Sequence, residues 1–321
     1  MTKAKVALVL GSGGARGLAH IGVLKVLEKN NIPIHLIVGT SMGAFVGGFY
    51  AAGTGIDLME NLALSVDRKF VARMLAPSFH RSGFVNGERI RSYLQELLGD
   101  LYVDQLRIPF ASVSADLTTG EEIIHDRGHL VDAIMASIAI PGVFKPIRYE
   151  NRYLVDGGIV NPLPVSVAHK LGADVVIAVN STPLPSQVGK QKRTQSINRL
   201  NKTITAMRDR LLRQTKMFDD KPIDQNVFQQ EKGGLTNASL ASATQPHLLQ
   251  TLMQSVATVE TKLQVLHLTQ WHADVLISPV IEGMNLLDFY RAKEMIDAGE
   301  HAANAALAEI RTAILRKAQE T

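Results

Sequence analysis

The sequence predicts an α/β fold in which helices cover both faces of a mainly parallel β-sheet. Short runs of β-branched and other apolar residues alternate with stretches of helical periodicity, the pattern of parallel strands joined by helical crossovers. Of the 321 residues, 46% are apolar and 20% are charged, so either one large domain or two domains can bury a core. We expect strands at residues 5–10, 36–38, 110–114, 152–155, 174–179 and 274–277.

Helical patterns follow several of these strands, but the alternation stops after residue 180. A basic segment, residues 190–216, is followed there by a polar segment, residues 219–247, which has no apolar period and which we interpret as a loop. The last predicted helix carries Ala and Leu on one face and charges on the other. The predicted helices cover residues 18–28, 42–52, 248–268 and 286–317.

Composition and two apolar stretches limit where the chain works. It has no cysteine, which excludes disulfides, thiolate metal sites and cysteine nucleophiles and fits a reducing compartment. The apolar run at residues 6–10 is too short for the core of a signal peptide. Residues 36–56 are uncharged and long enough to span a bilayer, but six glycines and a turn at Thr40 and Ser41 indicate a strand followed by a buried helix. We therefore expect a cytoplasmic protein.

Three motifs carry candidate chemistry, and the first is a glycine-rich loop at residues 11–17 (GSGGARG) between a strand and a helix. Backbone N–H groups of such a loop approach a ligand closely and, with the helix dipole, favour a phosphate or an oxyanion. Arginine at position 16 replaces a glycine of the dinucleotide fingerprint, and no acidic residue ends a strand near residue 36. A nucleotide site is therefore disfavoured, while a purely structural turn stays open.

The second motif is G-x-S-x-G at residues 39–43 (GTSMG), after a short apolar strand and before a charge-free helix. This is the setting of a nucleophile elbow, whose turn exposes the serine hydroxyl above the sheet edge. Ser41 is the candidate nucleophile.

The third motif, residues 156–158 (DGG), follows a predicted strand and offers the Asp156 carboxylate as a base. An aspartate with an ordinary pKa is a weak base, so burial would have to favour proton acceptance.

Together the three motifs resemble the patatin-like phospholipase family, and residues 137–146 (SIAIPGVFKP) are similar to a further conserved segment of that family. The resemblance implies a three-layer α/β/α sandwich over residues 1–182 and 264–321, with residues 183–263 as an insertion. It implies a Ser41–Asp156 dyad without histidine. The implied oxyanion hole consists of Gly13, Gly14, Arg16 and Met42, and the other motif glycines are Gly11, Gly39, Gly43, Gly157 and Gly158.

Histidines offer two competing interpretations. A Ser-His-Asp triad would use His247, His267, His272 or His301, which follow Asp156 in chain order, but none lies in a motif-like context. His125 and His129 are four residues apart and enclose a turn-like sequence rather than the helix of a zinc protease. We expect no metal and no cofactor.

The basic segment, residues 190–216, has nine Lys or Arg and one acid, a net charge of about +8 that leaves the remainder of the chain at about −4. Its apolar residues recur at helical spacing, so it can lie on an anionic membrane, or dock on the core with a solvated basic face. Nucleic acid is not expected as a partner, because no aromatic residues interleave with the cations. The spaced apolar residues are Ile197, Leu200, Ile204, Met207, Leu211 and Phe218.

The sequence as a whole predicts a serine lipid acyl hydrolase, of phospholipase A or lysophospholipase type, that forms a covalent acyl intermediate. Its expected substrates are phospholipids or lysophospholipids, and its expected place of work is the cytoplasm and the inner membrane surface. An acyltransferase or thioesterase with the same dyad stays open, as does a membrane-associated regulatory protein on this fold. The sequence leaves the oligomeric state undetermined.

Overall fold

The computed structural model describes residues 4–76, 85, 87–182, 248–281 and 283–320. The chain divides into two compact units, one formed by Met1–Gln191 with Leu252–Thr321 and the other by Lys192–Thr251. Almost all of the second unit lies outside the described residues. The basic segment 190–216 and the polar segment 219–247 lie outside them too, so their interpretations stay predictions.

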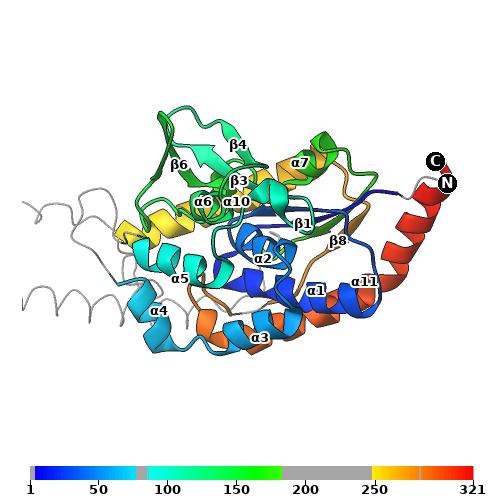
Figure 1. Ribbon diagram of the computed structural model, residues 1–321, viewed down its shortest axis with the longest axis horizontal. Helices are drawn as coiled ribbons and strands as arrows, with labels where there is room; N and C mark the ends of the chain where they lie inside the picture. The colour runs from blue at the N-terminus through cyan, green and yellow to red at the C-terminus, as the bar shows by residue number, and fades with distance from the viewer. Residues whose placement is uncertain (1–3, 77–84, 86, 183–247, 282, 321) are drawn as a thin grey trace, which may run out of the picture. The chain divides into compact units, whose positions relative to one another are not determined.

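A mixed sheet of eight strands forms the centre of the first unit, as far as the chain is described (Figure 1). Its order is β5-β6-β3-β2-β1-β7-β8, with β4 also paired to β3. The five strands from β3 to β8 in this order pair in parallel, whereas β4, β5 and β6 pair antiparallel. The strands are β1 (Val6–Leu10), β2 (Leu36–Thr40), β3 (Phe110–Asp116), β4 (Glu122–His125), β5 (Ile147–Tyr149), β6 (Arg152–Asp156), β7 (Val175–Val179) and β8 (Val275–Ile277).

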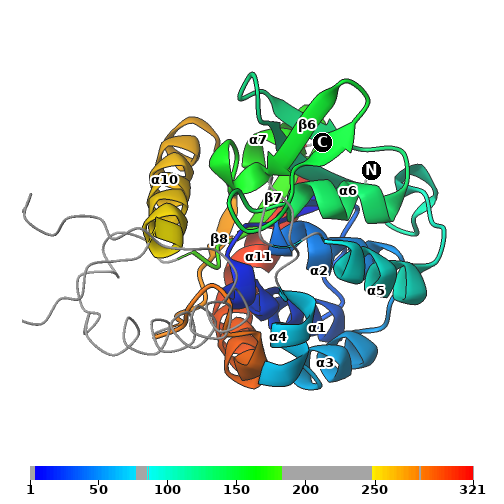
Figure 2. The same ribbon diagram turned by 90° about the vertical axis from the view of Figure 1, so that its left-hand side faces the viewer.

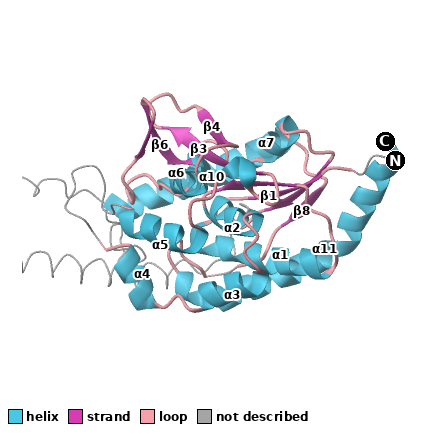
Figure 3. Ribbon diagram, in the orientation of Figure 1, coloured by secondary structure: helices cyan, strands magenta, loops and turns pink. Residues whose placement is uncertain are grey.

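Helices cover both faces of this sheet, which confirms the predicted α/β sandwich (Figures 2 and 3). Alternate residues of β1 point to opposite faces: Leu8 packs with α1, α2 and α11, while Val9 packs with α7 and the end of α10. The helices are α1 (Ala19–Lys29), α2 (Met42–Ala51), α3 (Ile56–Leu64), α4 (Arg68–Met74), α5 (Glu88–Leu98), α6 (Leu130–Ser137), α7 (Val165–Lys170), α10 (Leu248–Gln270) and α11 (Ala292–Glu320). Short 3₁₀ turns are η1 (Gly14–Leu18), η2 (Val103–Gln105), η3 (Gly157–Ile159) and η5 (Phe289–Arg291).

Two strands of the antiparallel edge, β4 and β5, were not predicted from the sequence, whereas β6 was expected at residues 152–155. Strands β4 and β5 are only four and three residues long and are incompletely buried, so they lack the apolar run that marks a central strand.

In the part of the chain that is described, none of the helices combines the length and the apolar character needed to cross a bilayer.

Helices α1 and α11 approach each other closely because each has a glycine at their contact. A Cβ atom on Gly299 would lie 2.0 Å from the Ala19 carbonyl oxygen, and one on Gly22 would lie 2.0 Å from that of Ile296. Neither backbone atom can move without shifting a helix.

We therefore expect Gly299→Ala to lower the free energy of unfolding by about 1–3 kcal/mol, as overpacking of a core does. Urea unfolding followed by circular dichroism measures the loss. Gly55→Ala is the matched control, because a Cβ there meets nothing within 4 Å. A Gly299→Ala protein as stable as the control would contradict the close-packing argument.

Candidate active site

The glycine-rich loop leaves the carboxyl end of β1 and is fixed by hydrogen bonds to its neighbours. The N–H of Gly11 donates to the Val179 carbonyl at 3.0 Å, and the N–H of Ser12 donates to that of Pro162 at 2.8 Å. Among the described residues, no hydrogen bond is recorded for the N–H of Gly13 or Gly14. The loop thus has two amides available at the start of η1, as an anion site requires.

His20 on α1 is hydrogen bonded to the first residue of this loop. Its Nε2 lies 2.8 Å from the Gly11 carbonyl oxygen, and because that oxygen accepts, Nε2 must donate. Burial lowers the pKa of His20 to about 4, although the bond to Gly11 acts in the opposite direction. His20 is therefore a neutral structural donor near pH 7.

Ser41 stands at the turn from β2 to α2 with φ 56° and ψ −120°, a backbone conformation that non-glycine residues rarely adopt. Its N–H donates to Ser137 Oγ at 2.9 Å, and the Ser137 hydroxyl donates to the Val113 carbonyl at 2.6 Å. The two flanking glycines are required by space: a Cβ on Gly43 would be 1.9 Å from the Leu10 carbonyl oxygen, and one on Gly39 would be 2.5 Å from a backbone nitrogen. The turn is the strained elbow that the motif predicts.

Asp156 ends β6 and faces the serine. Its Oδ2 accepts a hydrogen bond from Ser41 Oγ at 2.6 Å, and its Oδ1 accepts one from the N–H of Gly158 at 2.8 Å. Both side chains are buried, with Ser41 5% and Asp156 2% exposed. Burial raises the pKa of Asp156 to about 6, while the bonds from Ser41 and Gly158 act in the opposite direction. The raised pKa makes Asp156 a better proton acceptor than an exposed aspartate.

Arg16 is largely buried behind the glycine-rich loop. Its Nη1 donates to the Met284 carbonyl at 3.3 Å, and its Nε is buried without a partner among the described residues. Burial lowers the pKa of Arg16, and the nearby Glu260 and Asp288 act to raise it. Arg16 therefore places a positive charge near the loop, in a position to favour an anion there.

Sequence reasoning missed Glu260 and Gln264 on α10, which belong to the same surroundings. A Cβ on Gly158 would be 2.2 Å from Glu260 Oε1 and 3.2 Å from Asp156 Oδ1, so both carboxyl groups lie against this glycine. Gln264 donates to Asn180 Oδ1 at 2.6 Å. Neither residue stands in a recognisable motif, and only their burial in the fold shows their proximity.

An apolar cavity of about 190 Å³ adjoins Ser41. The serine, Gly14 and Met42 lie at its wall together with side chains from the five helices α1 to α5, from the turns η1 and η5, and from connecting segments that include the loop before η5. Phe45 and Phe49 contribute adjacent rings from α2, with centroids 5.0 Å apart. The other lining residues are Leu18, Ile21, Val46, Met59, Leu62, Ala63, Val66, Phe70, Val71, Met74, Leu75, Ile90, Tyr93, Leu97, Ile138, Ile140, Phe144, Leu286, Leu287 and Phe289.

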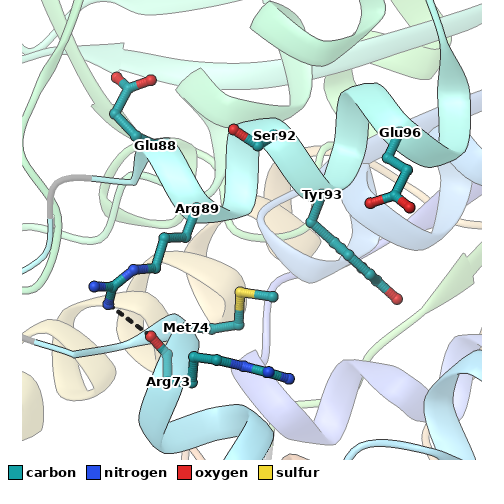
Figure 4. Close-up of a pocket in the computed structure, with 7 residues that line it drawn as sticks. All are labelled: Arg73, Met74, Glu88, Arg89, Ser92, Tyr93 and Glu96. Atoms are coloured by element: carbon teal, nitrogen blue, oxygen red, sulfur yellow. Dashed lines mark hydrogen bonds between the residues drawn. The ribbon is translucent and has the colours of Figure 1, made fainter.

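A second, polar pocket of about 390 Å³ lies between α4 and α5 and shares Met74 and Tyr93 with the apolar cavity (Figure 4). Arg89 Nη1 donates to the Arg73 carbonyl across it at 2.8 Å. Its remaining lining residues are Glu88, Ser92 and Glu96. Both positively and negatively charged side chains therefore line this pocket.

In the described part of the chain, none of the alternative histidines is hydrogen bonded to Ser41 or Asp156. His301 bonds the Asp297 carbonyl on α11, and the His272 carbonyl bonds His169. The surroundings of His267 include Glu122 and Lys170 rather than the dyad. His247 lies outside the described residues.

The two histidines considered for a metal do not share a site. His125 Nε2 lies 2.8 Å from Ser114 Oγ, and His129 Nδ1 lies 3.0 Å from an Asp100 carboxylate oxygen. Within the described ranges, no cluster of three or more His, Asp or Glu side chains is arranged to hold a metal ion.

The fold and the site together define an α/β/α protein with a buried serine–aspartate pair at a strand-to-helix elbow. The chain belongs to the patatin-like phospholipase family, whose model matches residues 8–169. That match includes the glycine-rich loop, the elbow and Asp156, and it confirms the resemblance seen in the sequence. It ends before α10.

Similar proteins include members of the neuropathy target esterase (NTE) family. An uncharacterised NTE-family protein of Mycobacterium tuberculosis is 44% identical over 176 residues, which are 55% of this chain and 49% of that protein. Lysophospholipase nte1 of Emericella nidulans is 33% identical over 182 residues, 54% of this chain and 12% of that protein. The chain thus matches half or less of the length of these relatives. The structure of VipD from Legionella pneumophila aligns with a TM-score of 0.37 and 14% identity, covering 84% of this chain and 67% of that one.

Proposed function

We propose that the protein is a serine lipid acyl hydrolase, of phospholipase A or lysophospholipase type, with Ser41 as nucleophile and Asp156 as base. The observation that carries the proposal is the 2.6 Å hydrogen bond from Ser41 Oγ to Asp156 Oδ2 beside an apolar cavity. A nucleophile in contact with its base, next to space for an acyl chain, is what ester hydrolysis of a lipid requires.

In the acylation step, Ser41 Oγ attacks the ester carbonyl while its proton passes to Asp156. Negative charge develops on the carbonyl oxygen, and in this proposal the N–H groups of Gly13, Gly14 and Met42 bind it, with Arg16 adding positive charge nearby. When the intermediate collapses, the ester C–O bond breaks and Asp156 returns the proton to the leaving alkoxide. The product is an acyl-serine.

Deacylation repeats these steps with water as the nucleophile in place of Ser41. The oxygen of a water molecule attacks the acyl-serine carbonyl while Asp156 accepts a proton from that water, and the same amides bind the second oxyanion. Collapse breaks the acyl–Oγ bond and the proton returns to Ser41. The fatty acid leaves, and every step uses residues of this chain alone.

The apolar cavity is proposed to hold the acyl chain. Its wall is almost wholly apolar and includes residues of α2, α3, α4 and α5. Burying each methylene of an acyl chain there contributes about 0.8 kcal/mol, so the cavity should favour long chains.

Ala63 on α3 lines this cavity, so Ala63→Leu should fill part of it. We expect the ratio of kcat/KM for long-chain to short-chain p-nitrophenyl esters to fall about tenfold, the effect of excluding about two methylenes. Leu58→Met on the same helix is the control, because Leu58 is exposed and does not line the cavity. An unchanged ratio in Ala63→Leu would place the acyl chain elsewhere.

The experiment that tests the proposed function is product analysis by mass spectrometry after incubation with defined lipids. Separate reactions contain a lysophospholipid, a diacyl phospholipid, a triacylglycerol and an acyl thioester, each with and without an acyl-acceptor alcohol. Fatty acid release from the phospholipids that exceeds release from the other substrates supports the proposal. Preferential thioester cleavage or acyl transfer to the alcohol would replace it with one of the alternatives.

A further inference from the structure

Glu260 is a third carboxyl group at this site, and it is contributed by a helix outside the segment that the family model matches. Its side chain is buried on α10, against the backbone of Gly158 and close to Asp156. A carboxyl group in such a place is costly to ionise unless a cation pairs with it.

The charged groups that face Glu260 come from two elements. Asp156 stands at the start of η3 and disfavours a second negative charge, while Arg16 of η1 favours one. Arg16 and Glu260 interact electrostatically. Asp288 lies near Arg16 as well. The Ser12 hydroxyl is a polar neighbour that stabilises the ionised form of Glu260 and so acts against the rise of its pKa. Asn180 and Gln264 lie nearby, each with one buried atom that lacks a partner among the described residues.

We propose that Glu260 controls the charge available at the oxyanion hole: while protonated it leaves Arg16 free to favour the oxyanion, and once ionised it neutralises Arg16. Glu260 is thus a positioning residue that acts through Arg16 and touches no reacting atom. The proposal rests on the proposed function, because it assumes that Ser41 forms an oxyanion intermediate beside the glycine-rich loop.

The direction of the pH dependence follows from the surroundings of the two acids. Burial raises the pKa of Glu260 to about 8, and the Asp156 carboxylate adds to the rise, while Arg16 acts against it. Asp156, with a pKa raised to about 6, ionises first, so the pair loses its two protons in separate steps. Between these steps Asp156 is a base and Glu260 is neutral. Above the second step we expect activity to fall.

The test measures the rate of Ser41 labelling by a fluorophosphonate between pH 5 and pH 10, in wild-type and Glu260→Gln proteins. The amide keeps the shape of the side chain but does not ionise. We expect the wild-type rate to fall at least about fivefold from pH 7.5 to pH 9.5 and the Glu260→Gln rate to keep its plateau. Glu309→Gln, which changes an exposed carboxylate on α11, is the matched control.

Two results would overturn the proposal: a wild-type rate that stays level above pH 8, or a Glu260→Gln rate that falls with the wild-type midpoint. A merely structural role would scale the whole profile without changing its shape. Labelling needs no lipid. Wild-type protein that is labelled but releases no fatty acid would therefore refute the proposed substrate class, while the pH profile of labelling would still test the role of Glu260.

Thermal unfolding gives a readout that does not depend on activity. The pKa of Glu260 is raised in the folded state from 4.5 to about 8, so its contribution to stability is fully present below about pH 4.5 and is lost as the pH rises toward 8. The Tm of Glu260→Gln should therefore rise relative to wild type across this window and then level off. A difference in Tm that stays constant with pH would contradict the buried acid on which the proposal depends.

Discussion

Wild-type protein is expected to take up one fluorophosphonate group per chain, and Ser41→Ala protein none. Ser41 is the serine whose hydroxyl donates to a buried carboxylate at 2.6 Å, and this contact is what activates an otherwise weak nucleophile. Intact-mass spectrometry measures the adduct without any assumption about the lipid. Ser65→Ala, at an exposed serine after α3, should label like wild type. Labelling of Ser41→Ala at the wild-type rate would contradict the assignment of the nucleophile.

The same measurement tests the base. Asp156→Asn keeps the size of the side chain but removes the proton acceptor, so labelling should slow by about 10²–10⁴-fold, the usual contribution of a general base. In wild type the rate should fall below about pH 6, because burial raises the pKa of Asp156 to that value and the protonated acid cannot accept a proton. An Asp156→Asn protein that labels at the wild-type rate would exclude Asp156 as the base.

The sequence predicted the central strands and the residues at their ends because local patterns determine both. The run Val6–Leu10 is buried on both faces and is followed by a glycine-rich loop, and Ser41 follows β2 in the same way. Such strand–turn–helix units can be recognised in short windows of sequence. β1 and β2 pair in parallel, so the glycine-rich loop and Ser41 follow strand ends at the same edge of the sheet. Asp156 ends a strand that pairs antiparallel with β3, and its meeting with Ser41 was expected only from the family resemblance.

The features that the sequence did not predict depend on long-range packing. Glu260 looks like an ordinary charge in a helical segment, and nothing near it in sequence indicates that it is buried against Gly158. The position of the cavity beside Ser41 was equally hidden from the sequence, because its wall combines side chains from five α-helices and from segments that are far apart in the chain. Apolar residues at helical spacing predict burial but do not predict where packing leaves space. Tertiary contacts therefore determine both the burial of Glu260 beside Asp156 and the position of the proposed acyl-chain site.

The glycine-rich loop provides the second large expected effect. Gly14 has φ 55°, and a Cβ on it would lie 2.6 Å from the Leu286 carbonyl oxygen and 2.5 Å from that residue's Cδ1. The same carbonyl accepts the N–H of Ala15 at 2.8 Å. A methyl group must therefore push the loop away from the segment that fixes it, and the amides of Gly13 and Gly14 move with it.

We expect Gly14→Ala to reduce kcat for ester hydrolysis by about 10²–10³-fold, the usual effect of losing one oxyanion donor, with a smaller change in KM. Gly120→Ala is the matched control: Gly120 also has a positive φ, 71°, but a Cβ there meets nothing within 4 Å. Both substitutions impose backbone strain, whereas only the first displaces amides beside Ser41. If the two variants lost activity equally, strain alone would explain the loss and the loop would not be the oxyanion hole. A loss confined to Gly14→Ala, with Ser41 still hydrogen bonded to Asp156, would separate stabilisation of the oxyanion from activation of the nucleophile.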